Sequence, residues 1–175
     1  NKEMPTFFNY PELQDRLIVL DGWSKAYSMT GWRMGWSVWP ESLIEHVNKL
    51  IINSVSCVNA PAQFGGIAAL DGSDEPIYSM MKKFDQRRTL IYEGLNSLPG
   101  VNCSLPGGAF YAFPNISGTG MSGSEFSQKC MYEAGVAIVP GVAFGKTAID
   151  YVRFSFAASQ DSISQALENI KKMLS

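Results

Sequence analysis

The sequence predicts an α/β fold, because short apolar runs typical of strands alternate with longer segments of helical periodicity. The first strand is expected at Leu17–Leu20, an apolar run short enough to be a strand buried in a sheet. The longest helix is expected at about 75–97, where apolar residues recur at spacings of three and four. Residues 150–156 alternate between two faces near the end of the chain, which predicts a strand with one core-facing side.

The remaining elements are predicted from apolar spacing, from short apolar runs and from the proline and glycine residues that begin or end them. Strands are expected at 34–39, 101–104, 109–113 and 136–139, and helices at 41–52, 61–70, 124–134 and 162–173. Pro40 should stop the strand before it, because proline cannot donate to a strand ladder. The apolar stripe of the 41–52 helix is expected to be core, and the turn 105–108 is expected to join its two flanking strands.

The composition is that of a globular chain of one domain or two small ones. Its 175 residues are 46% hydrophobic, and 14 Lys plus Arg against 16 Asp plus Glu give a net charge of −2. No basic block favours nucleic acid or an anionic membrane surface as a partner. The sequence has neither a run of about 20 apolar residues nor an apolar signal segment at its start. A cytoplasmic location is therefore expected.

Cysteine and histidine usage argues against disulfides and metals. Cys57, Cys103 and Cys130 are odd in number and widely spaced, without a CxxC pair. His46 is the only histidine, so a metal site or a catalytic triad built on it is not expected. We expect buried or half-buried free thiols and no metal.

The stretch Gly22–Trp36 carries the residues with the clearest chemical meaning. Lys25 falls in the loop that leaves the first strand, and an unprotonated lysine amine condenses with carbonyl compounds. Arg33 lies between Gly31 and Gly35, and its planar fork of donors matches two phosphate oxygens. One loop can thus hold an aldehyde-bearing cofactor covalently and electrostatically. Each residue also has an ordinary interpretation, as a solvated lysine and an arginine stacked on Trp32 or Trp36.

The ordered motif Ser24-Lys25, then Thr30-Gly31-Trp32-Arg33, resembles the lysine attachment motif of class I/II aminotransferases. These are the aspartate aminotransferase-like enzymes of pyridoxal phosphate fold type I. The resemblance implies that Lys25 forms a Schiff base with pyridoxal 5'-phosphate and moves the substrate proton, while Arg33 binds the cofactor phosphate. Many relatives have a phosphate-binding serine where this chain has Gly22, and Ser24 could supply a hydroxyl in its place.

Two later segments resemble the same family. The pattern alone favours an exposed charge on an edge strand for Arg153, but Tyr151–Ala157 resembles the family strand whose arginine binds the substrate α-carboxylate. Pro106–Pro114 resembles the Pro-Gly-Gly-Ala-Phe-Tyr signature of the family's small domain. Its aromatic side chains are expected to be core residues rather than cofactor contacts.

The resemblance also implies a domain organisation. Residues 1–75 correspond to the C-terminal part of the large cofactor-binding domain, 76–98 to the interdomain helix and 99–175 to the small, α+β C-terminal domain. The fold class is then α/β, combining the end of the large domain of a PLP-dependent transferase with that small domain. Segment 53–70 would contribute to a homodimer interface, although ordinary helix packing explains its small residues equally well.

The function implied is transfer of an amino group between an amino acid and a 2-oxo acid. The resemblance covers only the family's C-terminal half, so we expect a fragment of an enzyme, inactive by itself, whose other cofactor contacts lie upstream. Two alternatives stay open: a lyase or synthase of the same fold, and a ligand-sensing aminotransferase-like domain of a transcription regulator. The sequence does not indicate which amino acid is the substrate.

Overall fold

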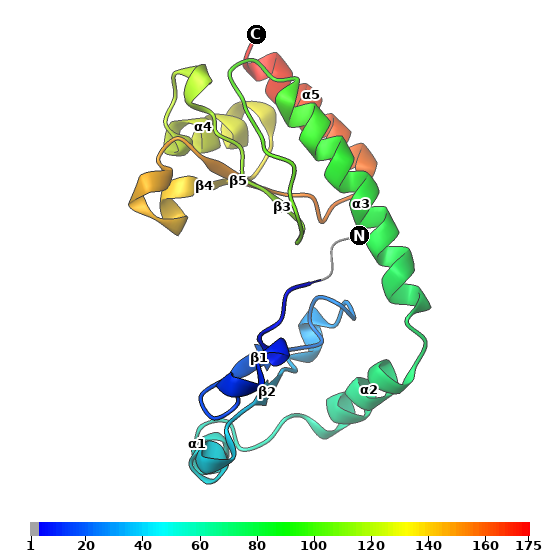
Figure 1. Cartoon of the computed structure of the whole chain (residues 1–175). Helices are drawn as coiled ribbons and strands as arrows, with labels where there is room; N and C mark the ends of the chain where they lie inside the picture. Colours follow the sequence, from blue (N-terminus) through cyan, green and yellow to red (C-terminus); the bar gives the residue numbers. More distant parts are fainter. Residues whose placement is uncertain (1–3) are drawn as a thin grey trace. The chain divides into compact units, whose positions relative to one another are not determined.

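The structure, a computed structural model, describes residues 4–175, which divide into two compact units between Ile77 and Tyr78 (Figure 1). Helix α3, Glu75–Asn96, begins in the first unit and continues in the second. This observed boundary lies close to the predicted start of the 76–98 helix, and from Tyr78 onward the helix is part of the second unit.

The first unit is built around an antiparallel pair of short strands. Strand β1, Val19–Asp21, pairs with β2, Trp36–Val38, so that Asp21 lies opposite Trp36. This pairing closes the connection 22–35 at its base. A Cβ atom at Gly22 would lie 2.8 Å from the carbonyl oxygen of Met34, so the two ends of the connection approach closely only because residue 22 is glycine.

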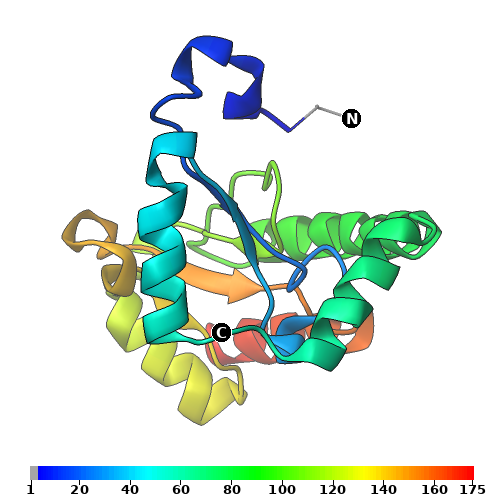
Figure 2. The ribbon, with the colours of Figure 1, turned by 90° about the horizontal axis from the view of Figure 1, so that it is seen from below.

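Helices α1, Ile44–Ser54, and α2, Ala60–Asp71, lie on either side of this strand pair (Figure 2). The Asn59 side chain caps α2 by accepting a hydrogen bond from the Ala62 N–H at 3.1 Å, and Pro61 occupies the first turn. Short 3-10 helices at Phe7–Asn9, Pro11–Leu13, Thr30–Trp32 and Glu41–Leu43 complete the described part of this unit.

Two predictions of burial are wrong in this unit. The predicted strand forms, shifted toward Asp21, but Leu20 is 73% exposed. The predicted helix 41–52 also forms, yet none of the described residues of α1 is buried and Leu50 is 66% exposed. A two-stranded sheet offers no second apolar layer, so the apolar stripe of α1 has nothing within the described part of this unit that covers it.

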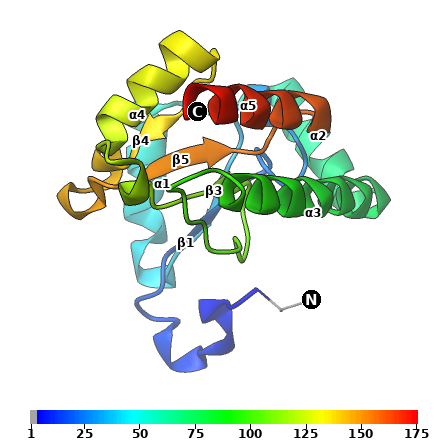
Figure 3. The same ribbon diagram turned by 90° about the horizontal axis from the view of Figure 1, so that it is seen from above.

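The second unit has a three-stranded antiparallel sheet in the order β3-β5-β4. Its elements after α3 are β3, Tyr111–Ala112; α4, Gly123–Lys129; β4, Val139–Pro140; β5, Val152–Ser155; and α5, Gln160–Met173. A π-helical turn, Cys130–Ala134, extends α4, and 3-10 helices lie at Ser117–Thr119, Gly141–Phe144 and Lys146–Ala148. Helices α3 and α5 lie side by side (Figures 1 and 3), with Gly94 of α3 against Leu167 of α5.

The core of the second unit gathers side chains from α3, α4, the π-helical turn and α5, and from strands β3 and β5. The predicted alternation of 150–156 is confirmed, since Val152, Phe154 and Phe156 are buried while Arg153 and Ser155 are not. Leu95 of α3 and Phe126 of α4 are fully buried in the same cluster. Residue pairs Tyr111–Ser155 and Val139–Arg153 fix the register of the sheet.

The prediction of two strands, 101–104 and 109–113, joined by a turn is wrong for the first of them. The first segment makes a single bridge between Asn102 and Asn115, and β3 pairs with β5 instead. The reason is that Asn96 accepts the Cys103 N–H at 2.9 Å and donates to the Cys103 carbonyl at 3.0 Å. The backbone groups that a ladder would need are therefore already paired with the end of α3.

Candidate functional site

Lys25 lies in a tight turn that follows β1 directly. The Tyr27 N–H donates to the Trp23 carbonyl at 3.2 Å, and the Ser28 N–H donates to the Lys25 carbonyl at 3.2 Å. Ser24 is half-buried, whereas Lys25 is exposed. The strand end and the turn thus fix the backbone of Lys25, an exposed residue of the connection 22–35.

Arg33 lies on the other arm of the same connection, where the 3-10 helix Thr30–Trp32 ends. Its backbone is left-handed, with φ 55° and ψ 48°, and its Nη1 atom donates to the Thr30 carbonyl at 2.9 Å. Ser28 and Ser56 also have positive φ, at 55° and 62°. Such backbone is unfavourable for residues other than glycine, and it clusters at functional sites.

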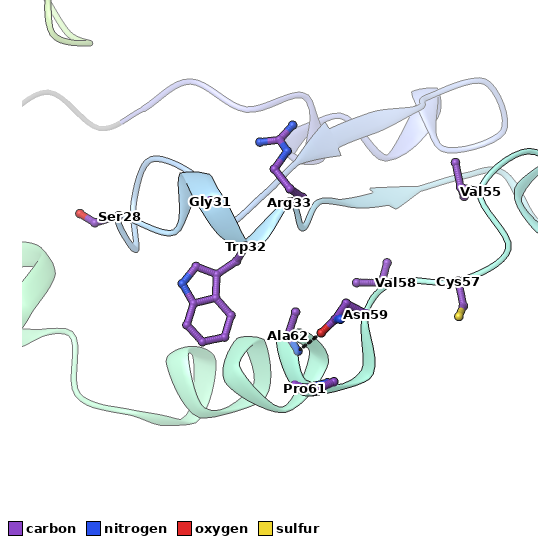
Figure 4. A pocket seen from close by; sticks show the side chains of 10 residues that line it. All are labelled: Ser28, Gly31, Trp32, Arg33, Val55, Cys57, Val58, Asn59, Pro61 and Ala62. Carbon is purple, nitrogen blue, oxygen red and sulfur yellow. Dashed lines mark hydrogen bonds between the residues drawn. The ribbon is translucent and has the colours of Figure 1, made fainter.

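Two tryptophans anchor the connection on α2 through a pair of glycines. The Trp23 indole N–H donates to the Gly66 carbonyl at 3.1 Å. A Cβ atom at Gly65 would lie 2.8 Å from Cζ3 of Trp32, and one at Gly66 would lie 3.3 Å from Cε2 of Trp23. The small residues of this helix therefore accommodate the rings that flank Lys25 and Arg33. In Figure 4 the Arg33 side chain extends away from the Trp32 ring, so the structure does not support the interpretation of Arg33 as stacked on that ring.

A pocket of about 850 Å³ lies beside this connection, lined by Arg33 and residues that precede and begin α2 (Figure 4). Its other lining residues are Ser28, Gly31, Trp32, Val55, Cys57, Val58, Asn59, Pro61 and Ala62. In Figure 4 the Trp32 ring extends toward α2, while the Arg33 side chain extends away from it. Lys25 is not a lining residue, although it shares the connection with Arg33.

Sequence reasoning missed Ser28 and Asn59 as lining residues. Asn59 could have been found from the sequence, because an asparagine two residues before a proline is typical of a helix N-cap. This position places it at the N-terminus of α2. Ser28 could not have been found in this way, because its position depends on a left-handed backbone that serine does not favour.

These residues fit a small molecule that bears both a phosphate and an aldehyde. Arg33 supplies a guanidinium and Ser28 a hydroxyl at the pocket, which are groups that donate to phosphate oxygens. Lys25, three positions before Ser28, supplies the amine. The chemistry of this donor set matches pyridoxal 5'-phosphate. Ser24, the other candidate ligand, lies half-buried beside Lys25.

Arg153 belongs to the second unit and lies on β5, the central strand of its sheet. Its guanidinium carbon is 4.4 Å from the ring centroid of Tyr111 and 4.7 Å from that of Phe144. The interpretation of Arg153 as a charge on an edge strand is therefore wrong. The expectation that the aromatics of 106–114 are core residues is also wrong in part, since Tyr111 is 36% and Phe113 is 41% exposed.

The described residues contain no group of three His, Cys, Asp or Glu side chains placed to hold a metal ion. Within residues 4–175, every helix is too short or too polar to cross a bilayer. What the described chain does contain is an amine and a guanidinium on one closed connection, and a second guanidinium held by aromatic rings. An amine of this kind can condense with a carbonyl compound, and a guanidinium can bind a phosphate or a carboxylate.

Comparison with known proteins identifies the family. The profile of the family "Aminotransferase class I and II" matches residues 4–170. The aspartate aminotransferase of Geobacillus stearothermophilus is 40% identical over 94% of this chain and 42% of its own length. That of Pyrococcus horikoshii is 37% identical over 95% of this chain and 44% of its own length.

A solved structure agrees with the sequence comparisons. The aromatic aminotransferase from Pyrococcus horikoshii superposes with a TM-score of 0.89 at 36% identity, covering 94% of this chain and 44% of that one. The chain therefore belongs to the class I and II aminotransferases, which use pyridoxal 5'-phosphate in this fold, and the resemblance predicted from the sequence is confirmed. The chain spans somewhat less than half the length of these relatives.

Proposed function

We propose that this chain supplies the cofactor-bonding lysine and two anion-binding arginines of a pyridoxal phosphate-dependent aminotransferase. The reaction is transfer of an amino group between an amino acid and a 2-oxo acid. One observation carries the proposal: Lys25 and Arg33 lie on the same closed connection, and Arg33 lines the pocket beside it. The names of the relatives favour an aminotransferase over the lyase and the sensor domain that the sequence left open.

Each residue of the first unit has a separate role in this proposal. Lys25 would hold the cofactor covalently through Nζ, and the same amine, once released, can accept a proton from the substrate α-carbon and return it. Arg33 would hold the phosphate, with Ser24 or Ser28 as a hydroxyl donor. When bound, the cofactor supplies the electron sink that the reaction needs.

Arg153 would bind the α-carboxylate of the amino acid. A guanidinium binds a carboxylate through two parallel hydrogen bonds, which orients the ligand as well as holding it. Arg153 would have this role with any amino acid substrate, because the α-carboxylate is common to all of them.

We also propose a domain organisation, an oligomeric state and a location for the full-length protein. Residues 1–75 would be the end of the large cofactor-binding domain, 76–98 the interdomain helix and 99–175 the small domain. We also propose that the full-length protein is a homodimer in which segment 53–70 lies at the interface, and that it is cytoplasmic. Light scattering and cell fractionation of the full-length protein would test these two points.

Reductive trapping tests the central assignment. Incubation of the 175-residue chain with pyridoxal 5'-phosphate, followed by borohydride, should attach the cofactor to the peptide that contains Lys25, as read by mass spectrometry. The Lys25→Ala variant should lose both the trapped adduct and the visible absorbance of the bound cofactor. Lys49→Ala is the matched control, because Lys49 is an exposed lysine of the same unit, paired with Glu45 at 2.7 Å. Equal labelling of both variants would refute the assignment.

We propose further that the 175-residue chain alone does not turn over, because it spans less than half the length of its relatives. Measurable transfer from an amino acid to 2-oxoglutarate by the purified chain would overturn this point. It would leave the assignment of Lys25 untouched, because trapping reports bonding of the cofactor and not turnover.

A further inference from the structure

We propose that Tyr111 and Phe144 are positioning residues, which orient the Arg153 guanidinium so that its N–H groups face an incoming carboxylate. The inference rests on the proposed function, because it concerns how the arginine assigned to the substrate carboxylate is held. It goes beyond that function by giving a role to two aromatic side chains of the second unit, one on β3 and one at the end of the 3-10 helix Gly141–Phe144.

The contacts of Arg153 carry the argument. Both rings approach its guanidinium carbon, at 4.4 Å for Tyr111 and 4.7 Å for Phe144, which is within the range of cation–π attraction. Within residues 4–175, the structure gives Arg153 these ring contacts but no hydrogen bond or ion pair. A guanidinium has five N–H donors in its plane, and a ring contact leaves that plane available. Arg153 is thus held while its donors stay ready for a ligand.

The local structure explains how the rings reach Arg153. Tyr111 lies on β3 opposite Ser155 of β5, two residues from Arg153 along that strand and on the same face. Phe144 ends the 3-10 helix Gly141–Phe144, which follows β4 on the other side of β5. The two rings therefore come from the elements on both flanks of the central strand.

A second layer of rings supports this arrangement. Phe113 makes an edge contact with Phe144 at a centroid distance of 5.9 Å, and it stacks on Tyr151 at 5.2 Å. Phe113 makes no ring contact with Arg153 in the described structure, so it serves as the matched control. It has an exposure similar to that of Tyr111, at 41% against 36%.

The test uses the 175-residue chain and nuclear magnetic resonance of the Arg153 Nε–H group, assigned by its loss in Arg153→Lys. Without ligand, this proton should be shifted upfield by the two rings. The shift should shrink in Tyr111→Leu and in Phe144→Leu, and it should persist in Tyr111→Phe, which keeps the ring. Titration with acetate and L-aspartate should show binding weakened about two- to fivefold by each leucine variant, restored in Tyr111→Phe and changed less in Phe113→Leu.

The outcomes separate this inference from the proposed function. Unchanged Nε–H shifts in both leucine variants, or equal carboxylate binding by them and the unmodified chain, would overturn the positioning role. If the shifts change as expected but neither the unmodified chain nor any variant binds a carboxylate, then the carboxylate role of Arg153 fails while the ring contacts stand. Circular dichroism of each variant distinguishes a change in the Nε–H signal from a loss of folding.

Discussion

The two units of this chain differ in what holds them together. All the buried hydrophobic side chains of the described residues lie in the second unit, except Met34 and Ala62. The first unit carries the connection with Lys25 and Arg33, yet its α1 has no buried residue and its sheet has two strands. The second unit encloses a core that joins three helices and a sheet. The residues proposed to hold the cofactor thus lie in the first unit, whereas most of the buried core lies in the second.

The largest expected effect is on unfolding of the second unit. Phe126→Ala should destabilise it by about 3–5 kcal/mol, the usual cost of removing a fully buried aromatic ring. Leu50→Ala, on the exposed face of α1, should change stability by less than about 0.5 kcal/mol. Urea unfolding followed by circular dichroism compares the two. Similar losses for both variants would show that α1 is packed as tightly as the core.

Thiol reactivity should divide the units in the same way. Cys57 is exposed, whereas Cys103 and Cys130 are buried, so a thiol reagent should label the native chain at Cys57 and the other two only after unfolding. Equal labelling of all three thiols in the native chain would contradict the proposed difference in packing.

Burial, with Glu133 nearby, raises the pKa of the Cys130 thiol to about 12, from an ordinary value of 9.0. Because the folded state favours the neutral thiol, its contribution to stability is complete below pH 9 and is lost as the pH rises toward 12. Unfolding of Cys130→Ala should therefore depend less on pH in this window than unfolding of Cys57→Ala. The same pH dependence in both variants would show that the Cys130 thiol does not contribute to the loss of stability at high pH.

A smaller effect is expected where α2 anchors the connection 22–35. Gly65→Val should displace the Trp32 ring, because even a Cβ atom there would lie 2.8 Å from Cζ3 of Trp32. Retention of pyridoxal 5'-phosphate during gel filtration should fall several-fold, since misplaced ligand groups bind less well. Gly107→Ala is the control, because a Cβ atom at Gly107 would meet nothing within 4 Å. Full retention in Gly65→Val would mean that the anchor does not matter for the cofactor.

The smallest effect belongs to the helix cap of α4. The Ser122 hydroxyl and N–H donate to the Glu125 carboxylate at 2.7 and 2.8 Å, which lowers the pKa of Glu125 below its usual 4.5. Stability from this contact is present above the usual pKa and is lost as the pH falls through the lowered one. Glu125→Gln should slightly reduce the loss of stability in acid. A steeper acid transition in that variant would contradict the sign.

The sequence predicted well wherever one local pattern decides the structure. Alternation at 150–156 correctly placed Phe154 in the core, and Pro61, a residue favoured in the first turn of a helix, correctly marked the start of α2. It failed at Leu20 and Leu50, because apolar periodicity shows which side chains could be buried but not what covers them. It failed again at Cys103, because the backbone of that residue is paired with the side chain of Asn96 at the end of α3, and apolar patterns do not reveal such a contact.

The sequence was enough to predict where the charged residues of the candidate site lie in the fold, but not which residues surround them. The spacing of Lys25 and Arg33 in one loop between two strands was enough to expect them on the same connection. The pocket residue Ser28 was hidden because its left-handed backbone has no sequence signal. Tyr111 was assigned to the core because burial statistics favour it there, although its strand face is the one that Arg153 shares.

The central claim is that Lys25 and Arg33 hold opposite ends of the same molecule. Its most direct test compares binding of pyridoxal 5'-phosphate with binding of pyridoxal, which lacks the phosphate, in the unmodified chain and in Arg33→Ala. The account predicts that Arg33→Ala weakens binding of the phosphorylated compound toward that of pyridoxal and leaves pyridoxal bonding to Lys25 unchanged. Equal weakening of both compounds, or of neither, would contradict it.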